Sequence, residues 1–260
     1  MGKIIAIANQ KGGVGKTTTA VNLGACLADK AKKVLIVDVD PQGNTTSGLG
    51  VDKEKLLETS YEMLLGDVQA AECIKRLDNF HLDLIPSSID LAGAEVELVG
   101  VGQRELLLEK QLKEIRDNYD IILIDCPPSL NVLTINAFRA ADSILVPIQC
   151  EFYAMEGLTQ LLNTINLVKK RLNPKIDIEG IVFTMFDSRA NLCAQVVEEI
   201  SAFMPSKVYQ TKILRNVRLA EAPSFGMPVI YYDRKSKGAE AYQDLADEVL
   251  KRLKKKGSRK

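Results

Sequence analysis

The stretch NQKGGVGKTTT, residues 9–19, decides the fold. It nearly matches the phosphate-loop pattern G-x-x-x-x-G-K-[ST], in which a glycine-rich backbone cradles the phosphates of a nucleotide. Counting back from Gly15, the first glycine of the pattern falls at position 10, where this chain has Gln10. A second lysine, Lys11, precedes the usual Lys16. An apolar run before the stretch and a helical pattern after it supply the strand–loop–helix context that a phosphate loop requires.

The residues of this loop suit phosphate binding for distinct physical reasons. Glycines lack Cβ, so Gly12 and Gly13 allow the backbone N–H groups to turn toward an anion. Lys16 can reach the β- and γ-phosphates, and the hydroxyl of Thr17 can ligate Mg²⁺. The positive dipole end of the following helix adds to this attraction. The predicted nucleotide-binding residues of the loop are Gly12, Gly13, Val14, Gly15, Lys16, Thr17 and Thr18.

Carboxylates follow two other apolar runs and supply what hydrolysis needs. Hydrolysis requires a carboxylate near Mg²⁺ and a group that orients water. Asp125 ends the run IILID, where it can hold the metal through a water. Asp38 and Asp40 alternate along VLIVDVD and share a face, and Asp40 lies further into the loop. We therefore expect Asp40 to place the attacking water, and Thr17, Asp40 and Asp125 to form the metal site. The alternative is that these are solvated acids at the sheet edge.

Apolar runs alternate with amphipathic stretches along the chain. Strands are expected at residues 3–9, 33–40, 120–128, 143–149 and 178–186, and less clearly at 81–88 and 228–233. Helices are expected at residues 17–30, 104–118, 155–171, 191–203 and 238–254. This order predicts an α/β P-loop NTPase fold, with a predominantly parallel twisted sheet and helices on both faces. We expect a single domain over residues 1–260, with a basic tail from about residue 254 to residue 260.

The composition excludes several classes of function. The 260 residues include 34 basic and 34 acidic side chains, so any binding to nucleic acid must use a local basic patch. A single histidine, His81, rules out histidine triads and multi-histidine metal sites. Five cysteines without a C-x-x-C pattern suit a reducing, cytoplasmic location. Met1 leads straight into a strand-like run, so we expect no signal peptide, and no apolar run approaches the roughly 20 residues of a membrane span.

Four stretches together resemble one known family. KGGVGKTTT (11–19), VDVDPQGNTTSGLG (37–50), DCPPSLNVLTINA (125–137) and RNVRLAEAPSFGMPV (215–229) are similar to the deviant Walker A ATPases of the ParA/MinD superfamily, and closely to its ParA-type chromosome-partition ATPases. The resemblance extends from the first expected strand to the last expected helix. It implies an ATPase that uses ATP and Mg²⁺.

The resemblance also implies roles for particular residues. Lys11 matches the lysine that reaches the phosphates bound by a second subunit, which implies a homodimer with ATP sandwiched between the subunits. Lys11 is thus both a catalytic and a nucleotide-binding residue, beside Lys16. Asp40 matches the switch I aspartate and Asp125 the switch II aspartate. For adenine, the family's pattern points to Thr184, Met185, Leu214 and Asn216, although the family often has proline where this chain has Leu214.

ParA-type relatives bind DNA without sequence preference as ATP dimers. Arg189 and Arg218 match positions implicated in DNA contact, within a late gathering of basic residues. The resemblance implies a nucleoid-associated cytoplasmic protein that binds double-stranded DNA as a dimer. It also implies a ParB-type centromere-binding partner, whose basic N-terminal segment stimulates hydrolysis in relatives.

Other members of the same fold offer alternative functions. A MinD-like protein binds membrane through a C-terminal amphipathic helix. Here we expect the apolar stripe of the last helix to pack on the domain, so we expect no stable membrane binding; the stripe consists of Leu245, Val249, Leu250 and Leu253.

An Fe–S carrier needs paired cysteines, which Cys126 and Cys150 do not provide in sequence. A tyrosine autokinase has a terminal tyrosine cluster, whereas here only Tyr242 lies in the last helix. An NTP-binding module without turnover also stays open.

Overall fold

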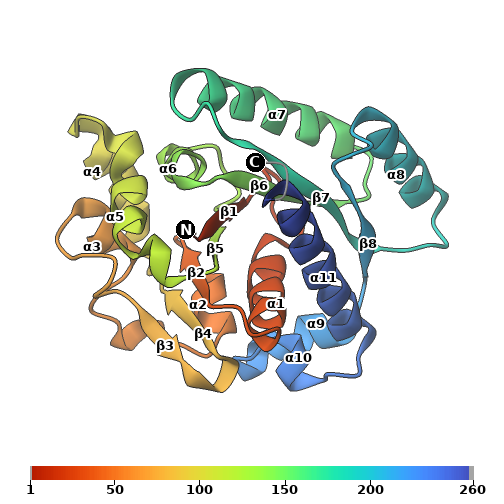
Figure 1. Cartoon of the computed structure of the whole chain (residues 1–260), viewed down its shortest axis with the longest axis horizontal. Helices are drawn as coiled ribbons and strands as arrows, with labels where there is room; N and C mark the ends of the chain where they lie inside the picture. Colours follow the sequence, from red (N-terminus) through yellow and green to blue (C-terminus); the bar gives the residue numbers. More distant parts are fainter. Residues whose placement is uncertain (1, 258–260) are drawn as a thin grey trace.

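The computed structural model describes residues 2–257 and has an eight-stranded sheet at its centre (Figure 1). The strand order is β3-β4-β2-β5-β1-β6-β7-β8, and every neighbouring pair is parallel except β3 with β4. The strands are β1 (Lys3–Ile7), β2 (Val34–Asp38), β3 (Lys75–Leu77), β4 (Leu82–Ile85), β5 (Ile121–Asp125), β6 (Ser143–Gln149), β7 (Asp177–Phe186) and β8 (Val208–Leu214).

Helices cover both faces of the sheet (Figure 1). Successive residues of a strand point to opposite faces, so Ile4 and Ala6 of β1 join one core while Ile5 and Ile7 join the other. The first core includes side chains from α3 (Ser60–Leu65), α4 (Leu91–Glu97), α5 (Leu107–Ile115), α6 (Val132–Ala140), α7 (Ala154–Arg171) and α8 (Asn191–Phe203). The second includes side chains from α1 (Lys16–Asp29), α9 (Val217–Glu221), α10 (Val229–Tyr232) and α11 (Lys237–Gly257). A short helix, α2 (Asn44–Gly48), follows β2.

The fold class expected from the sequence is confirmed, and several local expectations change. The expected set lacks the short strand β3 and the helices α3, α4 and α6. The weak strand candidate at residues 228–233 is wrong, because Val229–Tyr232 forms the helix α10. A four-residue apolar run does not show its period, so sequence alone does not separate a buried helical turn from a strand. The strand β8 is absent from the expected set. Its exposed and half-buried Gln210, Thr211 and Lys212 break the apolar run that marks an inner strand, because β8 is the sheet's edge.

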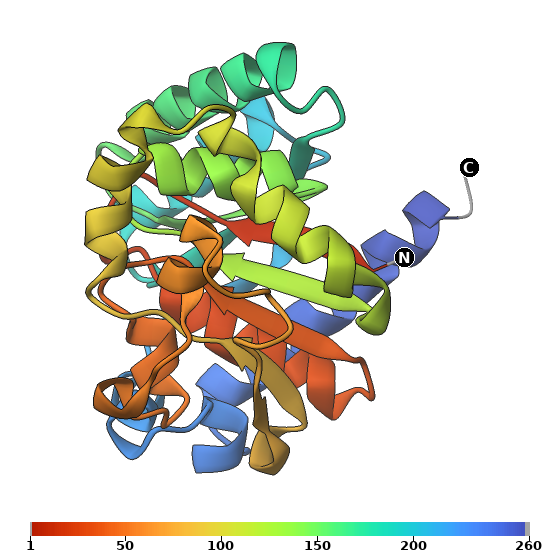
Figure 2. The same cartoon turned by 90° about the vertical axis from the view of Figure 1, so that its left-hand side faces the viewer.

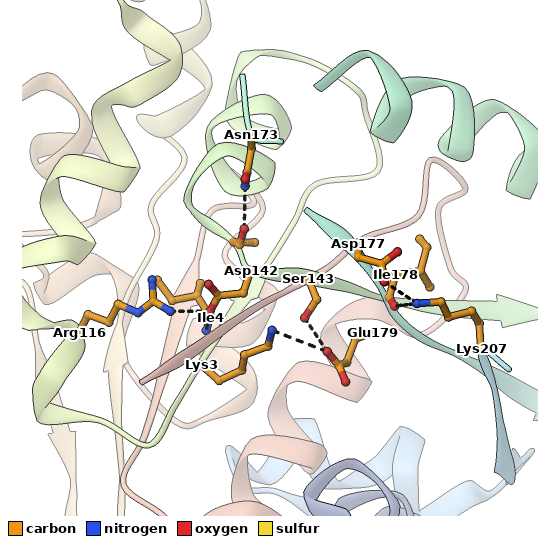
Figure 3. A network of polar contacts seen from close by, with 11 residues as sticks. Lys3, Ile4, Arg116, Asp142, Ser143, Asn173, Asp177, Ile178, Glu179 and Lys207 are labelled. Atoms are coloured by element: carbon orange, nitrogen blue, oxygen red, sulfur yellow. Dashed lines mark hydrogen bonds and ion pairs between the residues drawn. The ribbon is translucent and has the colours of Figure 1, made fainter. Parts of the chain in front are cut away.

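A polar network joins the amino ends of β1, β6 and β7 (Figure 3). Asp142, just before β6, accepts hydrogen bonds from the Ile4 backbone at 2.8 Å and from Arg116 at 2.6 Å. The pairing of β6 with β7 shifts register at Glu179, whose buried carboxylate accepts a 2.7 Å hydrogen bond from Ser143. These contacts fix the central strands at the edge opposite the phosphate loop. Figure 2 shows β1 and β5 pointing away from that edge, so their carboxyl ends are left for the site.

The last helix packs along the domain. Leu245 and Val249 of α11 are fully buried, and Leu250 and Leu253 pack against the same core, as the sequence led us to expect. The helix extends through Gly257, three residues beyond its expected end, so it includes part of the expected basic tail. Residues 258–260 of that tail lie outside the described residues. Within residues 2–257, no helix is both long enough and apolar enough to cross a bilayer.

Candidate functional site

The phosphate loop and both acidic loops meet at one edge of the sheet. β1 lies beside β5, which lies beside β2, and the register places Asp125 opposite both Ile7 and Asp38. Parallel strands end at the same edge, so the loops after these three strands face a common space. The end of β7 joins them, because the Thr184 hydroxyl donates a 2.8 Å hydrogen bond to the Val14 carbonyl of the phosphate loop.

The loop conformation depends on its glycines. Gly13 and Gly15 have φ of 75° and 85°, a left-handed region that residues with a Cβ rarely adopt. Gly15 occupies the N-cap of α1, and no side chain caps that end of the helix. The first-turn N–H groups of α1 therefore have no capping side chain and point toward the loop. This is the arrangement that binds phosphate at a helix N-terminus.

Lys16 lies almost wholly inside the site. Its ammonium group donates a 3.1 Å hydrogen bond to the Lys11 carbonyl, and the residue is 7% exposed. Burial lowers the pKa of Lys16, while the negative charges of Asp125 and Asp40 act in the opposite direction. A phosphate group in the loop would add further negative charge and favour the charged lysine.

Asp125 is a fully buried acid of the site. One carboxylate oxygen accepts hydrogen bonds from the hydroxyls of Thr17 and Thr45, both at 2.8 Å. The other oxygen, Oδ1, is buried and has no hydrogen-bond partner among the described residues. Burial and then the charge of Asp38 raise the pKa of Asp125 above its usual range. A buried carboxylate oxygen without a donor, next to a hydroxyl at the start of α1, fits a site for a hard divalent cation such as Mg²⁺.

Asp38 and Asp40 have different surroundings. Asp38 is fully buried and accepts hydrogen bonds from the Thr46 hydroxyl at 2.7 Å, the Thr46 backbone at 2.9 Å and the Asp40 backbone at 3.2 Å. Burial raises the pKa of Asp38, and the hydrogen bonds from Thr46 act in the opposite direction. These contacts make Asp38 a support for the loop. Asp40 instead lines the open cleft, with Oδ1 accepting a 3.0 Å bond from the Gln42 backbone.

A cleft of about 390 Å³ runs from the phosphate loop toward β8 and α9. The sequence-predicted residues that line it are Gly12, Gly13, Gly15, Lys16, Thr17, Thr18, Asp40, Thr184, Met185, Leu214 and Asn216. Lys11, Val14 and Asp125 are absent from its lining, since Val14 and Asp125 are buried behind it and Lys11 points elsewhere. The lining that sequence reasoning missed is Gln42, Asn44, Pro128, Ile213, Leu219, Ala220 and Tyr242.

The end of the cleft away from the phosphate loop is apolar and suits a flat base. Met185 adopts a positive φ of 47° there, and Ile213 and Leu219 lie on neighbouring elements. Asn216 caps α9, and its Oδ1 accepts bonds from the backbones of Arg218 at 2.9 Å and Leu219 at 3.3 Å. The capping role occupies the carbonyl oxygen, so recognition of a base by Asn216 falls to its NH₂ group.

Tyr242 is the missed lining residue with the clearest signal in the sequence. It is 1% exposed, and its hydroxyl lies 3.1 Å from the Thr19 hydroxyl of α1. The residue belongs to the apolar stripe of α11 that continues through Leu245 and Val249. The helical period predicts that the stripe is buried. Only the packing of α11 on α1 places the ring of Tyr242 beside the cleft.

Lys11 points away from its own cleft. Its ammonium group forms an ion pair with Glu151, in the turn after β6, and both side chains are about two-fifths exposed, at 43% and 41%. Asn9 holds the backbone of this end of the loop by accepting a 3.0 Å bond from the Lys11 N–H. Glu151 was not singled out from the sequence. Its position directly after an apolar strand is the signal that also identified Asp125.

The two candidate DNA-binding arginines lie on different elements, and each is paired with acids. Arg189, between β7 and α8, makes two bonds to Asp187 at 3.0 and 2.9 Å, and its side chain is 88% exposed. Arg218 on α9 contacts Glu221 at 2.8 Å and Asp233 at 3.2 Å, and its side chain is half exposed. Exposed pairs of this kind are weak, so they leave both guanidinium groups accessible to another anion.

Comparison with known proteins places this site in a family. A family model described as an AAA domain (AAA_31) matches residues 2–178. The chain is 58% identical over 249 residues to the sporulation initiation inhibitor protein Soj of Bacillus subtilis (strain 168). The matched region covers 96% of this chain and 98% of Soj. The chain is 53% identical over 252 residues to the chromosome partitioning protein ParA of Myxococcus xanthus (strain DK1622), covering 97% of this chain and 89% of that protein.

A solved structure shares the whole fold. It is a cobyrinic acid a,c-diamide synthase from Mycobacterium smegmatis with a bound ATP analogue and magnesium, with a TM-score of 0.86 and 39% identity over 98% of this chain and 96% of that chain. The fold is therefore shared with a protein of another name, while the highest of these identities is to a Soj protein. With more than half of its residues identical to Soj and to ParA over nearly its full length, the chain belongs to the Soj/ParA family of chromosome-partitioning ATPases, within the ParA/MinD group.

Proposed function

We propose that this protein is a Mg²⁺-dependent ATPase that forms an ATP-sandwich dimer, binds nonspecific DNA in that state and is stimulated by a ParB-type partner. The observation that carries the proposal is the placement of the two lysines. Lys16 is buried in a phosphate cleft, whereas Lys11, five residues earlier in the same loop, lies outside it at the surface. Lys11 does not line its own cleft, and its exposed ion pair with Glu151 is weak. Its ammonium group can therefore bind phosphates in the cleft of a second subunit.

Within one subunit, each residue of the cleft has a separate task. The loop N–H groups and Lys16 bind the phosphates, with Gly12, Gly13 and Gly15 giving the backbone its shape. Thr17, Asp40 and Asp125 would hold Mg²⁺, which when bound would neutralise charge on the phosphates. Asp40 orients the attacking water. The apolar end of the cleft, with Thr184, Met185, Leu214 and Asn216, receives adenine.

Across the dimer, Lys11 exchanges Glu151 for the phosphates bound by the other subunit. Its positive charge there stabilises the negative charge that develops on the transferred phosphoryl group. Hydrolysis then needs both subunits, because neither cleft contains this second lysine by itself. Turnover therefore depends on dimerisation, and loss of the γ-phosphate removes the anion that holds the two subunits together.

The relatives' names support a role in DNA segregation, since B. subtilis Soj and M. xanthus ParA are a sporulation inhibitor and a chromosome partitioning protein. In this chain, Arg189 and Arg218 are the proposed DNA contacts. A dimer doubles the number of phosphate contacts, and each contact contributes to affinity through counterion release. ATP thus controls DNA affinity through dimerisation. We place the protein in the cytoplasm, on the nucleoid, and expect no stable membrane binding, because the apolar stripe of α11 packs on the domain.

ATP turnover in four mixtures tests this function: the protein alone, with DNA, with the ParB-type protein of the same organism, and with both. We expect slow turnover alone and the fastest turnover with both. Lys16→Ala removes a charged phosphate ligand, so it should weaken ATP binding by roughly tenfold or more. Asp40→Ala is the matched control within the same cleft, and it should bind ATP and dimerise without turnover. Turnover that ignores both additions, or that survives in Asp40→Ala, would contradict the proposal.

A further inference from the structure

Helix α4 has apolar side chains on two opposite faces. Backbone bonds from Leu91, Ala92 and Gly93 to the three residues before the helix extend its helical turn back to Ser88, and a 3₁₀ turn continues it to Gly100. Leu91, Ala94 and Leu98 are buried in the core. On the opposite face of the helix, a solvent-facing row has residues three and four apart, and we name it the α4 stripe: Ile89, Ala92, Val96 and Val99. Its three large residues are 66%, 75% and 68% exposed.

The α4 stripe is bordered by carboxylates on both sides. By helical position Asp90 and Glu97 lie along one side and Glu95 along the other. Glu97 accepts a 3.2 Å bond from the Tyr61 hydroxyl of α3. The pKa of Tyr61 is raised by burial and then by Glu97, with Asp90 and Glu62 adding to the effect, which reflects the negative potential here. The surface therefore combines an apolar centre with carboxylates along both sides, and Arg104, which donates a 3.4 Å bond to the Val99 carbonyl, is the cation at its C-terminal end.

Ser87, shortly before α4, and Glu95, within it, contact the two loops that we assign to hydrolysis. Just before α4, the Ser87 hydroxyl donates a 2.8 Å bond to the carbonyl of Asp40. Within α4, Glu95 accepts a hydrogen bond from the amide of Asn131. Asn131 is the N-cap of α6 and ends the loop that begins at Asp125. Figure 1 shows α4 at the outer end of the helix layer, and its main helix contact is with α3.

We propose that the α4 stripe is the docking surface for a cationic amphipathic helix of a partner protein, which acts on ATP hydrolysis through the Ser87–Asp40 and Glu95–Asn131 contacts. A helix with apolar residues at spacings of three and four, flanked by Lys or Arg, matches both the apolar centre and the acidic border. The inference rests on the proposed function, because the partner is the protein that stimulates hydrolysis.

Charge disfavours the other occupants of this surface. DNA and an anionic membrane would meet Asp90, Glu95 and Glu97 with like charge. A second copy that presented the same face across a two-fold axis would bring these carboxylates together with their own equivalents. A cationic amphipathic helix instead pairs its basic side chains with these carboxylates, and its apolar side chains cover the α4 stripe.

The test uses stimulated ATP turnover of the full chain, with the ParB-type protein of the same organism as the probe. The variant Val96→Asp/Val99→Asp places charge in the α4 stripe without touching the core. Its matched control is Leu167→Asp/Phe203→Asp, which changes two residues of α7 and α8 that are each 56% exposed. We expect unchanged basal turnover in both, and a loss of about tenfold or more in apparent partner affinity for the α4 variant alone.

A charge variant provides a second arm that does not depend on the apolar substitutions. Asp90→Lys should weaken stimulation, whereas Asp67→Lys, at another exposed position, should not. If wild type is stimulated and the α4 variants respond like their controls, this inference is overturned while the proposed function stands. If wild type is not stimulated, the proposed function fails and the inference with it. Loss of ATP-dependent dimers in the α4 variant alone would make the surface a contact between two copies and also overturn the inference.

Discussion

Lys11 and Lys16 show how two identical side chains, five residues apart in one loop, can acquire different roles. Lys16 is the first residue of α1 and points back over the loop, so burial removes it from water. Lys11 precedes the glycines and pairs with Glu151 at the surface. An exposed ion pair contributes about 0–1 kcal/mol, so a phosphate group can compete for Lys11 at little cost. The first lysine is therefore available to another molecule, and the second is not.

Lys11→Ala tests this separation at the level of one residue. We expect ATP binding by the monomer within about twofold of wild type, because Lys11 does not line the cleft, and we expect stimulated turnover to be abolished. Titration with a fluorescent ATP analogue and phosphate release would measure the two effects. Lys110→Ala, an exposed lysine of α5, is the control. Normal stimulated turnover in Lys11→Ala would show that the lysine has no role across the dimer.

Elements of the fold control the site through the ends of strands. β1, β2 and β5 are adjacent, so their loops bring Lys16, Asp40 and Asp125 together across more than 100 residues of sequence. β7 and β8 add the far side of the cleft, with Thr184 and Leu214. That side depends on the close packing of β7 against its neighbour β8. Gly180 of β7 lies against the ring of Tyr209, where an added Cβ would come within 2.3 Å of a ring carbon.

Gly180→Ala should therefore destabilise the fold by about 1–3 kcal/mol, because the buried Tyr209 ring has no room to move. Urea unfolding followed by circular dichroism would measure the change in the free energy of unfolding. Gly157→Ala is the matched control, since no atom lies within 4 Å of the added Cβ in α7, and it should stabilise by about 0.5–1 kcal/mol. Equal stability of the two variants would show that the close approach at Gly180 has no energetic cost.

At the scale of the whole molecule, a neutral chain must bind DNA through local charge. Positive and negative residues number 34 each, and the exposed arginines near β7 and α9 are paired with acids of the same surface. Binding DNA exchanges those intramolecular pairs for phosphate contacts, so single-subunit affinity is low. In the function that we propose, dimerisation on ATP is the event that raises DNA affinity to a measurable level.

Arg189→Glu and Arg218→Glu should each abolish DNA binding while retaining ATP-dependent dimers. Each substitution removes a cation from both subunits and adds repulsion, and any remaining binding should also have a smaller salt slope, by about 0.9 for each DNA phosphate that is no longer neutralised. Gel shift at several salt concentrations, with sedimentation for the dimer, would measure both. Arg76→Glu, an exposed arginine on β3 at the other end of the sheet, is the control. DNA binding like wild type in both variants would place the patch elsewhere.

The local chemistry and the fold class could be derived from the sequence, because they depend on neighbours along the chain. The phosphate loop, the acids after two buried strands and the alternation of strand and helix are all short-range patterns. Edge strand β8, helix α10 and the role of Tyr242 depend on what lies across the sheet or on the neighbouring helix, so they needed the packed molecule. The same holds for Lys11 and Glu151, which are 140 residues apart in sequence. Sequence determined which residues can bind a nucleotide. Only the tertiary structure decided which lysine is buried and which acid lines the cleft, because burial and pairing are properties of surfaces brought together from distant parts of the chain.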